Sequence, residues 1–299
     1  MGSRGRPVRS ITNLIRLARP SHWIKNLFVL AALVFSRRLT EADAVLTSLV
    51  AFAAFCLASS GIYALNDVLD RREDALHPVK RRRPVAAGEI SPAVAVAWSL
   101  ILMAAAVAVG LAVRREFAAM VGAYLALTGA YVFGLKRVAI LDVLVIAFGF
   151  VLRAYAGGVA IDVWVSPWLV LCTLTLALFL GFAKRESERA ALGAAAADTR
   201  PVAWEVYDQK SLEHMMTVSA TLAIATYMLY TVSPETIERV GHPWMFVTVM
   251  PVVYGVFRFY RLAIAGSATG PVEMVRRDPA FVAALAVWMA MVAVLLFAV

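Results

Sequence analysis

The chain has 299 residues, of which 62% are hydrophobic and only 16% are charged, and its mean hydropathy is +0.76. A water-soluble domain carries about 25% charged residues, so this composition excludes an ordinary soluble protein and predicts surface that faces lipid. The formal charge of +9 would suggest nucleic acid as the partner of a soluble protein. In a membrane protein basic residues set orientation and bind phosphates, so we expect a lipid bilayer and no nucleic acid as partner.

The N-terminal 20 residues are basic, but they lack the long apolar core and the small-residue cleavage site of a signal peptide. We therefore expect residues 1–20 to form a basic cytoplasmic segment that leads into an interfacial helix.

The two cysteines, Cys56 and Cys172, both lie inside apolar runs. Their placement indicates neither a disulfide framework nor a zinc site.

Apolar stretches close to membrane-spanning length follow one another along the chain, separated by short polar breaks. Each approaches the roughly 20 residues that cross the hydrocarbon core of a bilayer. The first stretch is the weakest, because Lys25 and Asn26 interrupt its start. The predicted fold is an all-α integral membrane protein, a single domain over residues 1–299 with about nine transmembrane helices. They are expected near 22–36, 44–66, 93–113, 117–135, 139–160, 165–183, 212–232, 243–262 and 279–298.

The distribution of Lys and Arg predicts the orientation of these spans. With the N-terminus inside, 23 basic residues fall in inner segments and 5 in outer loops, while Arg153 lies within a span. The positive-inside rule therefore predicts a multi-pass protein of the cell inner (plasma) membrane with a cytoplasmic N-terminus. The inner loops are also long and chemically rich, so we expect the active site on the cytoplasmic side, in loops 67–92 and 184–211.

Four polar side chains follow the second span in the pattern N-D-x-x-D-x-x-x-D: Asn66, Asp67, Asp70 and Asp74. On a helix the three carboxylates are spaced i, i+3, i+7 and project from one face. Such close negative charges repel one another, and a divalent cation would neutralise them. Oxygen ligands suit Mg²⁺, which shares its shell with substrate phosphates, and they serve Mn²⁺ as well. The alternative is a solvated helix end whose acids pair with neighbouring basic residues.

A basic run comes directly after the acidic pattern, in the segment 77–84 with the sequence HPVKRRRP. Four consecutive cations beside a metal site would bind the phosphates that the metal leaves uncovered. From this run we select Lys80 and Arg83 as substrate-binding candidates. The alternative is a charge cluster that merely sets membrane topology.

A second charged group lies where span six ends, in the pattern K-R-x-x-E formed by Lys184, Arg185 and Glu188. Lys184 and Glu188 are one helical turn apart, so a stop-transfer cluster with an i,i+4 ion pair is the alternative to a phosphate site.

Two ionisable residues lie within span five. Arg153 is expected to face a polar cavity, because a charge in the membrane is expensive. Asp142 is expected to pair with a lysine or to touch the metal shell.

Together these motifs resemble the UbiA superfamily of intramembrane prenyltransferases, over roughly residues 14–298, and most closely its decaprenyl-phosphate phosphoribosyltransferase branch. The resemblance implies a helical bundle around a lipid-accessible cavity. The motifs that carry it are RPSHWIKN at 19–26, NDVLDRRED at 66–74, HPVKRRRPVAAGEI at 77–90, YVFGLKRVAILD at 131–142, RAYAGG at 153–158, KRESE at 184–188 and RRDP at 276–279. In one respect the chain departs from the wider superfamily: Lys184 and Arg185 stand where aromatic prenyltransferases place a second acid-rich motif. Cations there favour two phosphorylated substrates.

The resemblance implies transfer of 5-phosphoribose from phosphoribosyl pyrophosphate to a membrane polyprenyl phosphate, with Mg²⁺ as cofactor and pyrophosphate as leaving group. It implies metal ligation by Asp67, Asp70 and Asp74, and catalytic roles for Asp67, Asp70, Lys184 and Glu188. The expected substrate-binding residues are Lys25, Asn26, Asn66, Lys80, Arg83, Tyr131, Lys136, Arg153 and Arg185.

Two other functions are open at this point. A UbiA-type prenyltransferase would use the same acidic pattern to move a prenyl chain from a prenyl diphosphate to an aromatic acceptor. A transporter would place its polar residues near the membrane midplane, whereas here they cluster at one membrane face. The small-residue patches fit packing within one chain or in a homo-oligomer.

Overall fold

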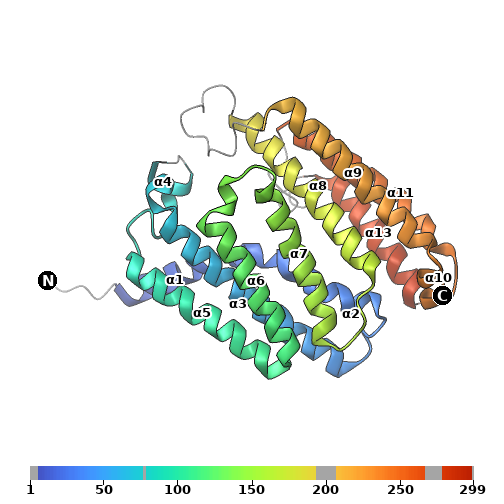
Figure 1. Ribbon diagram of the computed structural model, residues 1–299, viewed down its shortest axis with the longest axis horizontal. Helices are drawn as coiled ribbons and strands as arrows, with labels where there is room; N and C mark the ends of the chain where they lie inside the picture. The colour runs from blue at the N-terminus through green and yellow to red at the C-terminus, as the bar shows by residue number, and fades with distance from the viewer. Residues whose placement is uncertain (1–5, 77–78, 193–206, 267–277, 298–299) are drawn as a thin grey trace. The chain divides into compact units, whose positions relative to one another are not determined.

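The computed structural model describes residues 6–76, 79–192, 207–266 and 278–297, and within these ranges the regular elements are helices (Figure 1). Eight helical segments of the described chain are long and apolar enough to cross a membrane. They are α3 (Ala42–Leu69), α5 (Pro92–Val113), α6 (Arg115–Phe133), α7 (Leu141–Ala160), α8 (Pro167–Leu192), α9 (Gln209–Val232), η6 (Trp244–Thr248) with α11 (Val249–Ile264), and α13 (Pro279–Phe297). The predicted all-α membrane fold is confirmed, and the cavity that the resemblance implies stays a prediction.

The first of the nine predicted spans differs from the other eight. It consists of the 3₁₀ helix η1 (Pro20–Leu30, 11 residues) and the short α2 (Ala31–Phe35, 5 residues). A 3₁₀ helix rises about 2.0 Å per residue against 1.5 Å for an α-helix, so this pair extends about 30 Å. Fewer residues therefore reach the length that corresponds to the thickness of the hydrocarbon core.

From residue 24 to residue 29 the burial pattern of η1 repeats every third residue, because side chains at i and i+3 eclipse in a 3₁₀ helix, whereas Trp23, three residues before Asn26, is exposed. Residues 26 and 29 are buried, residues 22, 25 and 28 are half-buried, and residues 21, 24 and 27 are exposed. On the buried row, the carbonyl of Val29 lies where a Cβ at position 157 would be. Gly157 of α7 is therefore required for the close approach of the two backbones.

The chain divides into two compact units, residues 1–136 with 152–164 (unit 1) and residues 137–151 with 165–299 (unit 2). The expected single domain over the whole chain stays a prediction. In unit 1, α3 packs on α5, α6 and η1, and its core contains Phe55, Phe117 and Tyr124. Helix α1 (Arg6–Ala18) also packs on α3, with Leu17 fully buried.

In unit 2, α8 packs on α9, and α11 packs on α8, α9 and α13. The fully buried aromatic residues Phe179 and Phe259 contact each other at a ring-centroid distance of 5.7 Å. Met216 and Leu212 of α9 complete this core. A short helix α10 (Pro234–Val240) links α9 to η6 and is capped by the Ser233 hydroxyl. This packing fixes the end of α8 that carries Lys184 and Arg185.

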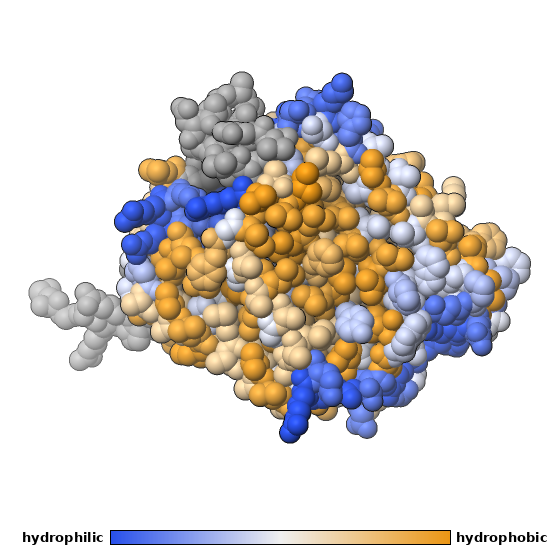
Figure 2. All heavy atoms as spheres, in the orientation of Figure 1, coloured by the Kyte–Doolittle hydropathy of each residue, from blue (hydrophilic) through white to orange (hydrophobic). Residues whose placement is uncertain are grey.

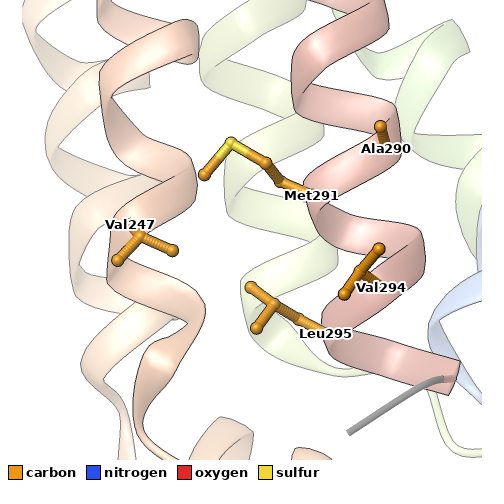
Figure 3. A pocket seen from close by; sticks show the side chains of 5 residues that line it. All are labelled: Val247, Ala290, Met291, Val294 and Leu295. Carbon is orange, nitrogen blue, oxygen red and sulfur yellow. The ribbon is translucent and has the colours of Figure 1, made fainter.

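The outward faces of the helices are apolar, as expected for lipid contact. Figure 2 shows apolar side chains over most of the visible face, with hydrophilic side chains gathered near helix ends. In unit 2 an apolar hollow lies between η6 and α13, where Val247, Ala290, Met291, Val294 and Leu295 line it (Figure 3). All five lining side chains are apolar, so this hollow is not a site for phosphate chemistry.

Two arginines of the predicted outer loops have a structural role in unit 1. Arg38 donates to the carbonyl of Ile161 at 2.7 Å, and Arg114 donates to the carbonyl of Val159 at 3.2 Å. Arg114 also pairs with Asp162 at 2.6 Å. The last carbonyls of a helix have no partner within it, and cations there interact favourably with the helix dipole. These arginines therefore cap the end of α7.

Candidate functional site

The acidic pattern lies where α3 ends and α4 (Arg71–Leu76) begins. Asp67 is in the last turn of α3, Asp70 caps that helix, and Asp74 lies in α4. The backbone N–H of Asp70 donates to Asn66 at 2.9 Å, and that of Asp74 donates to Asp70 at 2.8 Å. The helical spacing predicted from the sequence therefore continues across the break. Asp67 and Asp74 are almost fully buried, at 1% and 3% exposure.

Asp67 and Asp74 converge on one guanidinium. Nη1 of Arg83 lies 3.2 Å from Oδ1 of Asp67 and 2.5 Å from Oδ2 of Asp74. Arg83 follows η2 (Lys80–Arg82), so the loop after α4 folds back onto the acids. Arg19 makes a second ion pair with Asp67. A positive atom therefore bridges the two buried carboxylates.

The third carboxylate has a different partner. Nζ of Lys136 pairs with Asp70 and also donates to the side-chain oxygen of Asn66 at 3.1 Å. Lys136 lies in η3 (Leu135–Arg137), which directly follows α6. The structure thus brings together six predicted site residues, and every carboxylate of the pattern is paired with at least one cation. The six are Asn66, Asp67, Asp70, Asp74, Arg83 and Lys136.

The donor set fits a hard divalent cation bound together with a substrate. Within the described residues, no three acidic, histidine or cysteine side chains form a ready-made metal cage. Mg²⁺ rarely needs one, because it is commonly held by one or two carboxylates while phosphates and water complete its shell. The convergence of Asp67 and Asp74 on a single positive nitrogen provides such a pair.

Arg19 is a site residue that the sequence reasoning missed. Its guanidinium pairs with Asp67 and lies 5.2 Å from the ring centroid of Tyr63. Its backbone is in the left-handed region, with φ 51° and ψ 61°, directly before Pro20. A non-glycine residue in this region is uncommon. The available signal was its position at the start of the motif at 19–26.

The second charged cluster lies in unit 2, at the end of α8. Nε of Arg185 donates to Oδ2 of Asp142 at 2.8 Å, and its Nη1 donates to Glu188 at 2.8 Å. Nζ of Lys184 lies 3.6 Å from Glu188. The K-R-x-x-E pattern therefore forms the local ion pairs of the stop-transfer alternative. Arg185 also pairs with Asp142, a buried acid 43 residues away in sequence.

Tyr207 is the second residue that the sequence reasoning left out of the site. Its hydroxyl donates to Oδ1 of Asp142 at 2.5 Å and accepts the backbone N–H of Ile140 at 2.6 Å. Burial raises the pKa of Tyr207 well above its ordinary value, and its bond to Asp142 raises it further. The hydroxyl therefore stays a proton donor. Asp142, expected beside a lysine or the metal, is held instead by Tyr207 and Arg185.

The expected loop 184–211 is in part helix. Helix α8 continues through Lys184 and Glu188 to Leu192, because this stretch consists of good helix formers with ion pairs one turn apart. Glu186 is fully buried there and accepts two bonds from Arg189, at 2.8 and 2.6 Å. Residues 193–206 of the expected loop lie outside the described residues.

Arg153 and Asn26 belong to a buried network in unit 1. Arg153 donates from Nε to Asn26 at 2.7 Å and from Nη2 to the Tyr124 hydroxyl at 2.7 Å. Asn26 in turn donates to the Ser59 hydroxyl at 3.1 Å. With exposures of 5% and 0%, the two residues face protein groups. They tie η1 to α7, α6 and α3, and a substrate contact for either stays a prediction.

The remaining predicted residues occupy three further elements of unit 1. Lys25 is half-buried on η1, Lys80 is exposed on η2, and Tyr131 is half-buried in the last turn of α6. Their roles as substrate contacts stay predictions.

Comparison with known proteins gives matches over almost the whole chain. The model of the UbiA prenyltransferase family matches residues 26–274. Decaprenyl-phosphate phosphoribosyltransferase of Mycolicibacterium smegmatis is 34% identical over 285 residues, which cover 92% of this chain and 89% of the relative. The protein of the same name from Mycobacterium tuberculosis is 30% identical, with 96% and 95% covered.

Solved structures give the same fold. A UbiA homologue from Archaeoglobus fulgidus bound to GPP and Mg²⁺ superposes with a TM-score of 0.71, covering 95% of this chain and 99% of the homologue. The two sequences are 17% identical, so this likeness shows the fold alone.

Proposed function

This chain belongs to the UbiA prenyltransferase family, and from that premise we propose that it transfers 5-phosphoribose from phosphoribosyl pyrophosphate to a membrane polyprenyl phosphate. The observation that carries this proposal is the near full-length similarity to decaprenyl-phosphate phosphoribosyltransferases, at 30–34% identity. Family membership and the apolar helices make the chain a multi-pass membrane protein.

The donor is assigned to the acidic cluster of unit 1. Asp67, Asp70 and Asp74 would hold Mg²⁺, which supplies charge neutralisation for the pyrophosphate leaving group when it is bound. Arg83 already contacts two of these carboxylates, so it is placed to bind leaving-group oxygens when they arrive. Lys80 on the adjacent η2 is exposed and would bind the 5-phosphate or complete the pyrophosphate site.

The acceptor phosphate is assigned to the cations of unit 2. Lys184 has a side chain that is 46% exposed, whereas Arg185 is 16% exposed and held by Asp142 and Glu188. Guanidinium binds phosphate with two parallel hydrogen bonds, and ammonium binds it as a compact charge. Lys25, in the middle of η1 in unit 1, is a candidate for binding a substrate phosphate.

The reaction exchanges one carbon–oxygen bond for another. The bond from C1 of the ribose to pyrophosphate breaks, and the pair of electrons leaves with the pyrophosphate. An oxygen of the acceptor phosphate then bonds to C1, which passes through an oxocarbenium-like state. Because that oxygen is already anionic, the step needs no strong general base. Preorganised cations stabilise the charge that develops on the leaving group.

We place this reaction at the cytoplasmic face of the inner membrane. The excess of basic residues in the segments carrying both charged clusters supports a cytoplasmic N-terminus. Phosphoribosyl pyrophosphate is water-soluble and intracellular, so a cytoplasmic site meets the donor directly.

A second candidate function is prenyl transfer from a prenyl diphosphate to an aromatic acceptor. The solved homologue bound to GPP and Mg²⁺ favours it, because the acidic cluster would serve either diphosphate. The cationic end of α8 favours the phosphoribosyl reaction, since a neutral aromatic acceptor needs no Lys184 or Arg185.

The two functions are separated by the choice of donor. Purified protein in detergent or membranes is incubated with labelled phosphoribosyl pyrophosphate, polyprenyl phosphate and Mg²⁺. We expect label to enter the organic-soluble lipid fraction and this transfer to stop when EDTA is added. No transfer by folded protein, together with prenylation of an aromatic acceptor from a prenyl diphosphate, would reverse the order of the two candidates.

A further inference from the structure

Asp142 is a buried carboxylate with both oxygens engaged. Its residue exposure is 1%, and Oδ1 accepts from the Tyr207 hydroxyl while Oδ2 accepts from Nε of Arg185. A buried carboxylate is costly unless it is paired and hydrogen-bonded. Here the two partners, Arg185 and Tyr207, both follow Asp142 in sequence, 43 and 65 residues away. The arrangement therefore joins the start of α7, the C-terminal part of α8 and the segment that precedes α9.

The backbone at this junction is strained. Ile140 has φ 69°, and a β-branched residue in the left-handed region is a genuine outlier. Its N–H donates to the Tyr207 hydroxyl at 2.6 Å. Strain of this kind persists only where the surroundings over-determine the conformation, and it clusters at functional sites. The hydroxyl of Tyr207 is thereby held between a backbone donor and a carboxylate acceptor.

Arg185 is fixed by two acceptors. Asp142 receives Nε, and Glu188 receives Nη1 at 2.8 Å, so the plane of the guanidinium is defined by protein atoms. Lys184 is its neighbour in sequence but contrasts with it, because its side chain is 46% exposed and its nearest carboxylate oxygen is 3.6 Å away. Arg185 is thus held by two acceptors, whereas Lys184 is more exposed and makes a longer ion pair.

We propose that Asp142 and Tyr207 are positioning residues, which hold Arg185 in the orientation that receives the acceptor phosphate. The proposal rests on the assignment of Arg185 to the polyprenyl phosphate in the proposed function. A planar guanidinium gains affinity for phosphate only when its fork faces the oxygens. Loss of the positioning bonds should therefore weaken the acceptor and leave the donor unaffected.

The test uses Asp142→Asn and Tyr207→Phe in the full-length protein, with the two substrates varied separately. The KM for polyprenyl phosphate should rise about tenfold for Asp142→Asn, which removes the charge that holds Arg185, and about threefold for Tyr207→Phe, which removes one hydrogen bond to Asp142 but keeps its ion pair with Arg185. The KM for phosphoribosyl pyrophosphate should stay within about twofold, since no bond to it is removed. The matched control is Asp208→Asn, because Asn also caps a helix and Asp208 caps α9.

A double-mutant cycle separates positioning from folding. Lysine at position 185 cannot make the two-point contact, so in an Arg185→Lys background Asp142→Asn should add little further loss. Full additivity in this cycle would overturn the proposal. So would an unchanged acceptor KM in Asp142→Asn protein of normal thermal midpoint, or an equal rise in both KM values.

A measurement without turnover separates this proposal from the proposed function. Polyprenyl phosphate is titrated into the protein in the absence of donor, and its binding is followed by the rise in thermal midpoint. Weaker binding to Asp142→Asn than to the Asp208→Asn control supports the positioning role even if no ribosyl transfer is found. Equal binding to both variants would refute it even if the transfer reaction is established.

Discussion

The charged clusters of the two units are built in opposite ways. In unit 1 the carboxylates Asp67, Asp70 and Asp74 are fixed on one stretch of helix, and long cationic side chains reach them from other elements. In unit 2 a cation on α8 is the fixed group, and Asp142 and Glu188 hold it. The cations of the two clusters are similarly buried, at 17–23% exposure in unit 1 and 16% for Arg185. The difference therefore lies in which charge the helix carries: carboxylates on α3 and α4 suit a metal ion, and a guanidinium on α8 suits a phosphate.

The largest expected effect comes from the acids of unit 1. Asp67→Asn or Asp70→Asn should lower turnover by roughly 10³-fold or more, because the metal and the preorganised charge at the leaving group are lost together. Ribosyl transfer to lipid is the measurement. Glu73→Gln is the control, because Glu73 is an exposed acid in the same segment. Full activity of either Asp variant at normal thermal midpoint would remove the assigned metal site.

The second prediction compares the close helix contacts of the two units. Gly157→Ala places its Cβ against the backbone carbonyl of Val29, whereas Gly181→Ala in unit 2 meets a side-chain methyl of Val143. A side chain can shift more cheaply than a backbone. We expect Gly157→Ala to lower the thermal midpoint by about 5 °C or more, and Gly181→Ala by less. Gly122→Ala, with open space around it, should not lower it. The reverse order would contradict the close packing of η1 on α7.

The third prediction concerns the two cations of α8. Lys184→Ala should raise the acceptor KM by about threefold, less than Arg185→Ala, because an exposed ion pair contributes little. Its effect should also shrink in high salt, which screens exposed charges. Kinetics at low and high salt test this difference. An equal salt dependence for both variants would mean that Arg185 is no better held than Lys184.

The smallest effect is expected at Asp278, which precedes α13. Hydrogen bonds from Arg258 and from the backbone of Phe281 lower the pKa of Asp278 below its ordinary value. A lowered pKa stabilises the fold above the unfolded value of about 4, and this contribution is lost as pH falls through the folded value. Asp278→Asn should therefore lower the thermal midpoint slightly at pH 7, and the difference should shrink toward pH 3. A difference that grows on acidification would contradict this sign.

The sequence predicted the features that depend on local signals. The length and hydropathy of apolar runs place eight helices, and the spacing of Asp67, Asp70 and Asp74 places three carboxylates near one another. The ion pairs between residues far apart in the sequence could not be predicted in this way. Arg19 and Asp67 are 48 residues apart, and Asp142 and Arg185 are 43 apart. Such pairings follow from helix packing, on which composition and periodicity carry no information.

The 3₁₀ geometry of the first apolar stretch could likewise not be predicted from the sequence. Residues 20–30 contain Pro20, Lys25 and Asn26 among apolar residues, and nothing in this composition selects 3₁₀ over α geometry, which depends on tertiary contacts. The packing of Val29 on Gly157 and the bonds of the buried Asn26 are two such contacts. The two contacting residues, Asn26 and Val29, are three residues apart, and side chains at this spacing eclipse in a 3₁₀ helix.

That threefold row has a consequence for how this segment changes over evolutionary time. Ser21, Ile24 and Leu27 form its exposed row and constrain little beyond remaining compatible with lipid, whereas Asn26 and Val29 are enclosed by neighbours. Related proteins that keep η1 should accumulate substitutions at every third position from 21 to 27. Substitutions that recur with a period of 3.6 residues in the same stretch would identify relatives in which this segment is an ordinary α-helix.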